Sequence, residues 1–258
     1  MGFEIGHIMI PYYGFCIAIG ILAAGSVGIA MVHMFHRDVN DFITLAAMVG
    51  LGGLLGAKML YLILSWEEID FSRLTEAEYL SVLLGSGFVF YGGLIGGLLA
   101  ALFCMKFLRI DVPGYISIAM PCIPIAHGFG RIGCSLVGCC YGIPYAGPGA
   151  ICYTDSWFAP NDVPLFPVQL TEAILNFLIA GALLLYIWRN RGKMRNSLLL
   201  YLMLYAPVRF ILEFLRYDDV ERGIFLGVST SQWISILVFA GAVCFYIIRK
   251  KKGSRTDI

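Results

Sequence analysis

The sequence predicts an all-α integral membrane protein with seven transmembrane helices, and three observations support this class. Hydrophobic residues make up 59% of the 258 residues and charged residues only 14%, and the mean hydropathy is +0.82. Runs of about 20 apolar residues, enough to cross about 30 Å of hydrocarbon, recur along the chain. Lysine and arginine gather in alternate connecting segments. Soluble domains are less apolar than this, so we expect residues 1–258 to form a single transmembrane domain.

The apolar runs divide the chain into seven candidate spans. They lie near residues 8–32, 42–64, 86–108, 114–133, 168–188, 197–215 and 229–248. The fourth span is the least regular, because two prolines and two polar residues interrupt it: Pro121, Pro124, His127 and Arg131. The N-terminus, MGFEIGHIMIPYYG, lacks a basic segment and a small-residue cleavage site, so we expect a first span rather than a removed signal peptide.

The basic residues predict the orientation, because cytoplasmic loops are enriched in lysine and arginine. Twelve lie on one side of the seven spans: Arg37, Lys106, Arg109, Arg189, Arg191, Lys193, Arg195, Arg249, Lys250, Lys251, Lys252 and Arg255. Only Arg73, Arg216 and Arg222 lie on the other. The N-terminus should therefore be outside and the C-terminus cytoplasmic. The net charge of +1 gives no indication of a nucleic-acid partner.

Polar side chains inside the predicted spans converge at one depth. An ionisable residue at mid-span costs about 2.5–3.5 kcal/mol, so it usually faces a bundle interior or a wet cavity. With the predicted span directions, nine polar residues fall in the outer half of the membrane: Tyr13, Lys58, Tyr91, Arg131, Gln169, Glu172, Tyr205, Arg209 and Glu213. The sequence thus predicts a polar site there. External loops at about 65–85 and 134–167, the second rich in Gly, Pro and Cys, should lie over it.

Two arginines predict a phosphate site. Tyr205, Arg209 and Glu213 recur every four residues and so share one helical face. Arg209 and Glu213 could simply neutralise each other, but Arg131 is expected at the same depth and has no acidic residue at helical spacing. Two guanidinium groups facing one cavity suit a phosphate, which arginine binds with two parallel hydrogen bonds.

Cysteines follow Arg131 closely in HGFGRIGCSLVGCCYG, residues 127–142. His127, Arg131 and Cys134 would share a helical face, and His127 could equally be an ordinary core histidine. Cys134, Cys139, Cys140 and Cys152 are predicted to be external, where a disulfide, a reactive thiolate, a metal site or inert thiols are all open alternatives. The spacing lacks the C-x2-C pair typical of zinc sites, so we expect no metal or other cofactor.

Two glycine-rich stretches predict close packing between helices. GLGGLLGAK at 50–58 and YGGLIGG at 91–97 each contain Gly-x-x-x-Gly. This spacing lets two membrane helices approach closely.

Seven short motifs, taken in order, resemble the prolipoprotein diacylglyceryl transferase family. They are PYYG at 11–14, GAKMLYLIL at 56–64, FYGGLIGG at 90–97, PCIPIAHGFGRIG at 121–133, PVQLTE at 167–172, LYAPVRFILEF at 204–214 and STSQW at 229–233. The resemblance implies a multi-pass enzyme of the bacterial cytoplasmic (inner) membrane. It also implies transfer of a diacylglyceryl group from phosphatidylglycerol to the lipobox cysteine of a preprolipoprotein.

The resemblance also assigns residues. It places Arg131 and Arg209 on the phosphate, with Tyr13, Tyr205, Glu213 and Gly142 at matching motif positions. The chain departs from the family at Tyr91, where the family has a histidine, and at Cys134, Val137 and Cys139, where it has two asparagines and a glutamate. The proposed base is therefore missing, and His127 or Cys139 is the expected replacement.

The predicted catalytic residues are therefore Arg131, Arg209, His127, Cys139 and Tyr13. The predicted substrate-binding residues are Tyr91, Cys134, Gly142, Gln169, Glu172, Tyr205, Glu213 and Lys58. The expected partners are phosphatidylglycerol or a related phospholipid, a preprolipoprotein signal peptide and membrane lipids. Three other functions stay open: a divergent paralogue with another lipid or acceptor, a membrane thiol-redox protein, and a lipid or anion binder without chemistry.

Overall fold

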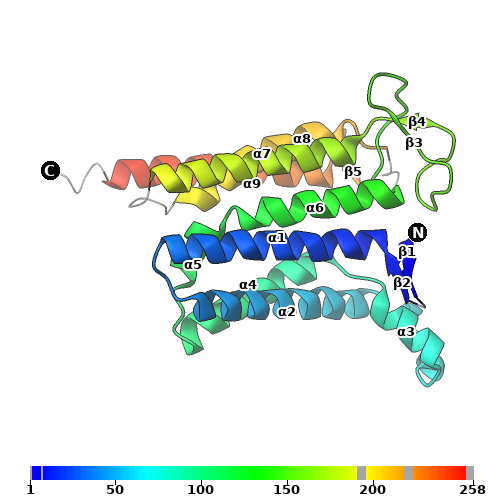
Figure 1. Ribbon diagram of the computed structural model, residues 1–258, viewed down its shortest axis with the longest axis horizontal. Coiled ribbons are helices and arrows are strands. Elements are labelled where there is room, and N and C mark those ends of the chain that lie inside the picture. The colour runs from blue at the N-terminus through cyan, green and yellow to red at the C-terminus, as the bar shows by residue number, and fades with distance from the viewer. Residues whose placement is uncertain (1, 7, 191–195, 218–222, 254–258) are drawn as a thin grey trace. The chain divides into compact units, whose positions relative to one another are not determined.

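The computed structural model describes residues 2–6, 8–190, 196–217 and 223–253. Within these residues the long helices are α1 (Tyr12–Met34), α2 (Val39–Leu64), α4 (Phe90–Phe107), α6 (Cys122–Val137), α7 (Val168–Arg189), α8 (Ser197–Glu213) and α9 (Thr230–Gly253) (Figure 1). Shorter helices are α3 (Ala77–Gly85), α5 (Val112–Ala119) and the 3-10 turns Trp66–Glu68 and Phe71–Arg73. The predicted all-α membrane class is confirmed.

The described residues also form three two-stranded antiparallel pairs. They are β1 (Gly2–Ile5) with β2 (Ile8–Pro11), β3 (Ile151–Cys152) with β4 (Pro164–Leu165), and β5 (Ile224–Phe225) with β6 (Val228–Ser229). The first pair corrects the predicted start of the first span, because residues 8–11 pair as a strand and the helix begins after Pro11.

Five of the described helices are long and apolar enough to cross a membrane: α1, α2, α4, α7 and α9. A sixth candidate is the pair α5 and α6, which is bent by 53°. The bend lies at Met120–Pro121, where the sequence predicted an irregular span, because proline cannot donate the helical hydrogen bond. The predicted span at 197–215 is α8, whose 17 residues are fewer than the about 20 that a span needs. Seven spans therefore stays a prediction.

The chain divides into two compact units, Met1–Met31 with Ile116–Ile258, and Val32–Tyr115. In the second unit, α2 packs on α4 through the predicted glycines. A Cβ on Gly56 would meet the carbonyl oxygen of Gly92, and one on Gly96 would meet that of Gly52. The predicted Gly-x-x-x-Gly packing is thus confirmed. The loop expected at 65–85 contains α3, a helix that the sequence analysis missed. That the whole chain forms one domain stays a prediction.

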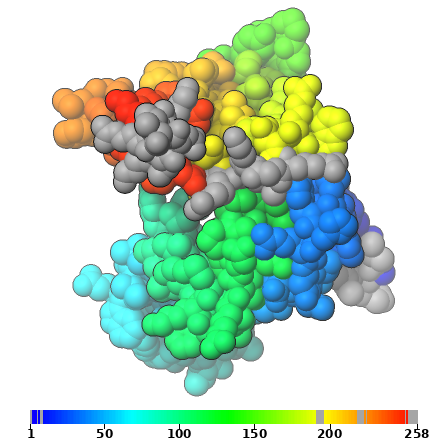
Figure 2. All heavy atoms as spheres, turned by 90° about the vertical axis from the view of Figure 1, so that its left-hand side faces the viewer, coloured from blue at the N-terminus to red at the C-terminus, as the bar shows by residue number. Residues whose placement is uncertain are grey.

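In the first unit, α6 packs on α7, α7 on α8, and α8 on α9. Met120, Ile179, Leu183 and Tyr201 form a buried apolar cluster beneath these contacts. The C-terminal part of α9 appears in red in Figure 2. Arg249 Nη1 donates to Asn196 Oδ1 at 3.1 Å. Five basic residues used for the orientation lie outside the described residues: Arg191, Lys193, Arg195, Arg222 and Arg255.

Candidate functional site

A first polar cluster is centred on Glu172 of α7, which contacts residues of α6 and α8. Its side chain is only 2% exposed, and its Oε2 lies 3.0 Å from Nε of Arg131 on α6. From α8, the hydroxyl of Tyr205 donates to Oε1 of the same carboxylate at 3.2 Å. This acidic partner of Arg131 could not be identified from helical spacing, because Glu172 lies on another helix, α7. Because the pair is largely buried, removal of either partner would leave an uncompensated charge, which is costly.

His127 lies beside this ion pair. Its Nε2 accepts a hydrogen bond from Arg131 Nε at 3.2 Å and lies 3.5 Å from Glu172 Oε1. Its ring also meets that of Tyr205 edge to face, with ring centres 5.4 Å apart. Because the lone pair of Nε2 is already engaged, His127 must give up the Arg131 hydrogen bond before it can take a proton there.

Arg209 forms a second buried ion pair, within α8. Its Nη2 lies 2.8 Å from Glu213 Oε2 and 3.2 Å from Ser231 Oγ, which it reaches as donor. Ser229 Oγ donates to Glu213 Oε1 at 2.9 Å. Arg209 and Glu213 therefore form the neutralising ion pair that the sequence predicted as one alternative. This ion pair does not engage every donor of the Arg209 guanidinium, because Nη1 is buried without a hydrogen-bond partner among the described residues.

The two arginines belong to one polar region. Tyr205, four residues before Arg209 on α8, donates to Glu172, which is also the ion-pair partner of Arg131. A buried N–H that lacks an acceptor is unusual and suits an anionic ligand oxygen. The region thus contains a buried guanidinium N–H of Arg209 without a partner among the described residues, and a phosphate site formed by the two arginines stays a prediction.

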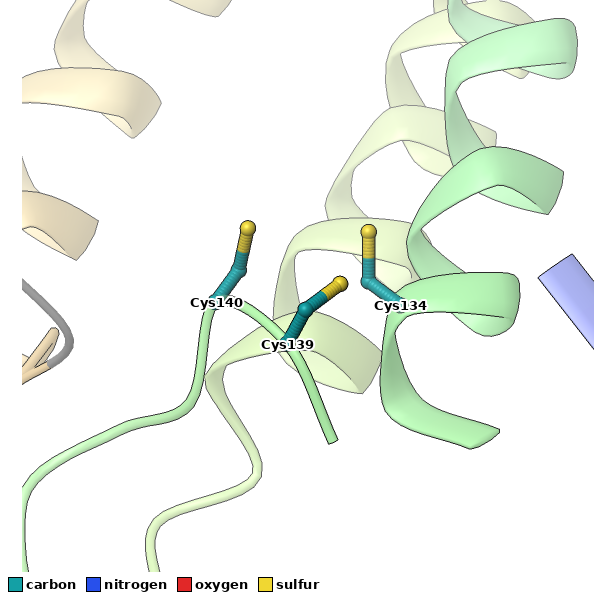
Figure 3. Close-up of side chains that lie close together, drawn as sticks. All are labelled: Cys134, Cys139 and Cys140. Atoms are coloured by element: carbon teal, nitrogen blue, oxygen red, sulfur yellow. The ribbon is translucent and has the colours of Figure 1, made fainter. Parts of the chain in front are cut away.

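Three cysteines gather at the end of α6. The sulfur atoms of Cys134, Cys139 and Cys140 all lie within 4.8 Å of one another. Figure 3 shows Cys134 on the helix and the other two on the segment that follows, with their sulfur atoms turned to one side. All eight cysteines are free thiols, so the disulfide alternative is not formed, and Cys152 is exposed on β3 outside the cluster.

The turn after α6 creates this cluster. Gly138 ends the helix in the left-handed region, at φ 80°, and its N–H donates to Cys134 O at 2.9 Å. Cys140 takes a left-handed φ of 58°, which a residue with a Cβ adopts only at a cost. The surrounding hydrogen bonds hold this conformation: Gln169 Nε2 donates to Cys139 O at 3.0 Å, and Tyr153 OH to Ser135 O at 2.9 Å.

The thiols of Cys139 and Cys140 are shifted in pKa in opposite directions. Hydrogen bonds from Cys134 and Cys139 lower the pKa of Cys140 below its usual range, and the charges of Arg216 and Arg131 lower it further. Hydrogen bonding to the other two thiols raises the pKa of Cys139, and burial raises it further. The cluster thus stabilises negative charge on sulfur.

A cavity of about 470 Å³ opens beside the thiols. It is lined by Tyr13, Val137, Cys139, Trp157 and Phe158. Its volume is in the range of small-molecule sites, about 300–1,000 Å³. Trp157 and Phe158 are strongly exposed, at 85% and 60%. The predicted residues Tyr13 and Cys139 therefore share one largely apolar recess.

The remaining predicted site residues have structural surroundings of their own. A Cβ on Gly142 would meet the carbonyl oxygens of Phe166 and Leu215, so glycine is needed there for packing. In the second unit, Lys58 Nζ donates to carbonyl oxygens of Leu83, Ser86 and Gly87 at the end of α3. Tyr91 is half exposed in the first turn of α4. Substrate roles for these three residues stay predictions.

Most of the side chains that support the site were not predicted from the sequence. Ser229 and Ser231 hold the Arg209–Glu213 pair, and Tyr153 and Gln169 hold the cysteine turn. Of these, only Gln169 was a predicted site residue. The stretch STSQW was a signal for the two serines, because its hydroxyls lie at the start of a span whose neighbouring helix carries buried charges.

The whole chain is similar to one protein family. A family model described as prolipoprotein diacylglyceryl transferase matches residues 1–248. A phosphatidylglycerol–prolipoprotein diacylglyceryl transferase of Clostridium tetani is 39% identical over 253 residues, covering 97% of this chain and 98% of that protein. The second enzyme of that name from Clostridium perfringens is 33% identical over 252 residues, covering 98% and 96%. A Dehalococcoides mccartyi relative is 29% identical over 260 residues, covering 100% and 96%.

Proposed function

Since the chain belongs to the prolipoprotein diacylglyceryl transferase family, we propose that it transfers a diacylglyceryl group from phosphatidylglycerol to a thiol of a prolipoprotein. The observation that carries the proposal is the buried Nη1 of Arg209, which has no hydrogen-bond partner among the described residues, on a helix whose Tyr205 donates to Glu172 of the Arg131–Glu172 pair. The relatives' names support this reading over a thiol-redox function.

In this proposal the arginines act on the phosphate of the donor lipid. Arg209 Nη1 donates to one phosphate oxygen, and Arg131 contributes positive charge from the neighbouring helix. The acceptor sulfur attacks the glycerol carbon, the carbon–oxygen bond breaks, and glycerol phosphate leaves with the electron pair. Charge grows on the phosphate in this step, so preorganised guanidinium groups stabilise the transition state more than the ground state.

The base of the reaction is a separate part of the proposal. Tyr91 occupies the family's histidine position, and His127 or Cys139 is the proposed replacement. His127→Gln keeps a hydrogen-bonding side chain of similar shape but removes the basic nitrogen. Full activity of this variant would exclude His127 as the base.

The proposed setting is the bacterial cytoplasmic membrane, with seven spans and an external N-terminus. The twelve-to-three distribution of lysine and arginine supports this orientation, and the broken pair α5–α6 together with α8 would supply the sixth and seventh crossings. The signal peptide of the acceptor would approach within the membrane, where the recess near Tyr13 and Cys139 is apolar.

The test combines purified protein, labelled phosphatidylglycerol and a peptide with an apolar segment that precedes a single cysteine. Mass spectrometry should show the diacylglyceryl mass on the peptide cysteine and an equal amount of glycerol phosphate. A matched peptide with serine in place of the cysteine should remain unmodified. Glycerol phosphate released without peptide modification would point to the divergent-paralogue alternative instead.

A further inference from the structure

Three neighbouring thiols form a candidate set of metal ligands, and the proposed role of the arginines does not explain why they lie together. The sulfur atoms of Cys134, Cys139 and Cys140 lie within 4.8 Å of one another and on one side of the turn. Zinc–sulfur bonds are about 2.3 Å long, which places tetrahedral thiolates about 3.8 Å apart. A small movement of the side chains is therefore enough to enclose a metal ion.

Disulfide formation explains this arrangement less well. A disulfide joins two sulfur atoms at about 2.05 Å, so the third cysteine of the cluster would have no bonding partner there. Cys139 and Cys140 are adjacent in sequence, which makes bonding between them difficult. The turn that positions all three sulfur atoms is held by the backbone hydrogen bond from Gly138 to Cys134 and by Gln169 on α7.

We propose that Cys134, Cys139 and Cys140 bind one Zn²⁺ ion and that the acceptor thiol occupies its fourth coordination position. Zinc bound by three protein ligands keeps such a position for water or substrate. Among the described residues, the cluster contains these three ligands and no further histidine, cysteine or carboxylate. The apolar cavity borders Cys139, which gives an acceptor chain a route to the ion.

The acceptor role rests on the proposed transferase function. Coordination displaces the proton of the acceptor thiol to solvent, because a thiol bound to zinc is deprotonated. The bound thiolate forms the sulfur–carbon bond to the glycerol carbon while the carbon–oxygen bond to the phosphate breaks. Glycerol phosphate leaves with that electron pair, and the zinc keeps its charge. In this proposal the bound ion, rather than His127 or Cys139 as a base, promotes deprotonation of the acceptor thiol, and Cys139 acts as a zinc ligand. Nε2 of His127 already accepts a hydrogen bond from Arg131.

Metal content tests the site without reference to activity. The full chain, purified in detergent without chelator, should contain about one zinc per molecule, and X-ray absorption should show three or four sulfur neighbours at about 2.3 Å. Cys139→Ser should lower the content at least tenfold, whereas the matched control Cys152→Ser, on the same loop, should retain it. A zinc-free wild-type chain that binds no added zinc would overturn the proposal, as would three-coordinate copper in the same position.

Cobalt substitution tests the fourth position. Addition of the acceptor peptide to the Co²⁺ form should strengthen the sulfur-to-cobalt charge-transfer band by about one third, and the serine peptide should leave it unchanged. Removal of zinc should lower transfer at least a hundredfold, with recovery on adding Zn²⁺. Equal transfer by the zinc-free chain would overturn the proposal but leave the transferase function intact. Zinc and peptide binding without any transfer would support the metal site and refute the transferase function.

Discussion

The Nε of Arg131 lies 3.0 Å from Oε2 of Glu172, and this contact joins α6 to α7 across the buried site. The carboxylate therefore neutralises the guanidinium when no lipid is bound. If Arg131 binds the donor phosphate as proposed, its guanidinium then serves two anions, and the strength of the Arg131–Glu172 pair should affect lipid binding.

Glu172→Gln tests this relationship. It leaves the buried Arg131 without a counter-charge, and breaking such a pair costs about 3–5 kcal/mol. We expect a lower unfolding temperature in detergent and a larger stabilisation by added phosphatidylglycerol than in the wild type, because the phosphate replaces the lost charge. An unchanged lipid-induced shift would show that Arg131 does not meet the phosphate.

Arg209→Lys tests the unpaired donor. Lysine keeps the charge and can reach Glu213, but it loses the planar group that carries Nη1. A hydrogen bond to a charged group contributes about 1.5–3 kcal/mol, so transfer should fall about tenfold to a hundredfold. Steady-state kinetics with labelled phosphatidylglycerol measures this. Arg37→Lys is the matched control, since the exposed Arg37–Asp111 pair lies in the other unit, and its activity should stay at the wild-type level.

Ser231→Ala should act through Arg209. The hydroxyl accepts from Nη2 at 3.2 Å, and its loss frees the guanidinium to turn. Leaving a buried donor unsatisfied costs about 1–3 kcal/mol. We expect kcat to fall five- to fiftyfold with little change in KM, and Ser231→Thr to restore most of it. A rise in KM alone would instead assign Ser231 to lipid binding.

Lys58→Met distinguishes a structural from a substrate-binding role. The Lys58 ammonium binds carbonyl oxygens at the end of α3, so its removal should speed hydrogen exchange in residues 83–88 about tenfold. Transfer should remain within threefold of wild type, as in the exposed control Lys106→Met. If transfer were lost while hydrogen exchange stayed unchanged, Lys58 would be a substrate-binding residue, as the sequence predicted.

The sequence predicted the helical class and most span boundaries because apolar length is a strong signal. It missed the hairpin before Tyr12, where an apolar strand and an apolar helix look alike, and it missed α3 within a polar segment. The break near Pro121 was visible, because proline acts locally.

The sequence indicates candidate site residues one by one, but not which of them contact one another. Arg131 and Glu172 were both selected, yet their pairing depends on how α6 packs on α7, which no spacing rule encodes. Likewise, the C-x4-C-C pattern argued against metal binding because it lacks the usual zinc spacing. The left-handed turn at Gly138 brings those thiols together anyway.

The length of α8 has a consequence for the surrounding bilayer. Its 17 residues, at about 1.5 Å each, span about 25 Å, less than the about 30 Å of hydrocarbon. Lipids accommodate such a hydrophobic mismatch by thinning locally. If α8 crosses the bilayer as proposed, thinning beside it would draw the headgroup layer toward Arg209, which lies near the C-terminal end of the helix. A donor lipid bound there, as proposed, would need to sink less far to present its phosphate.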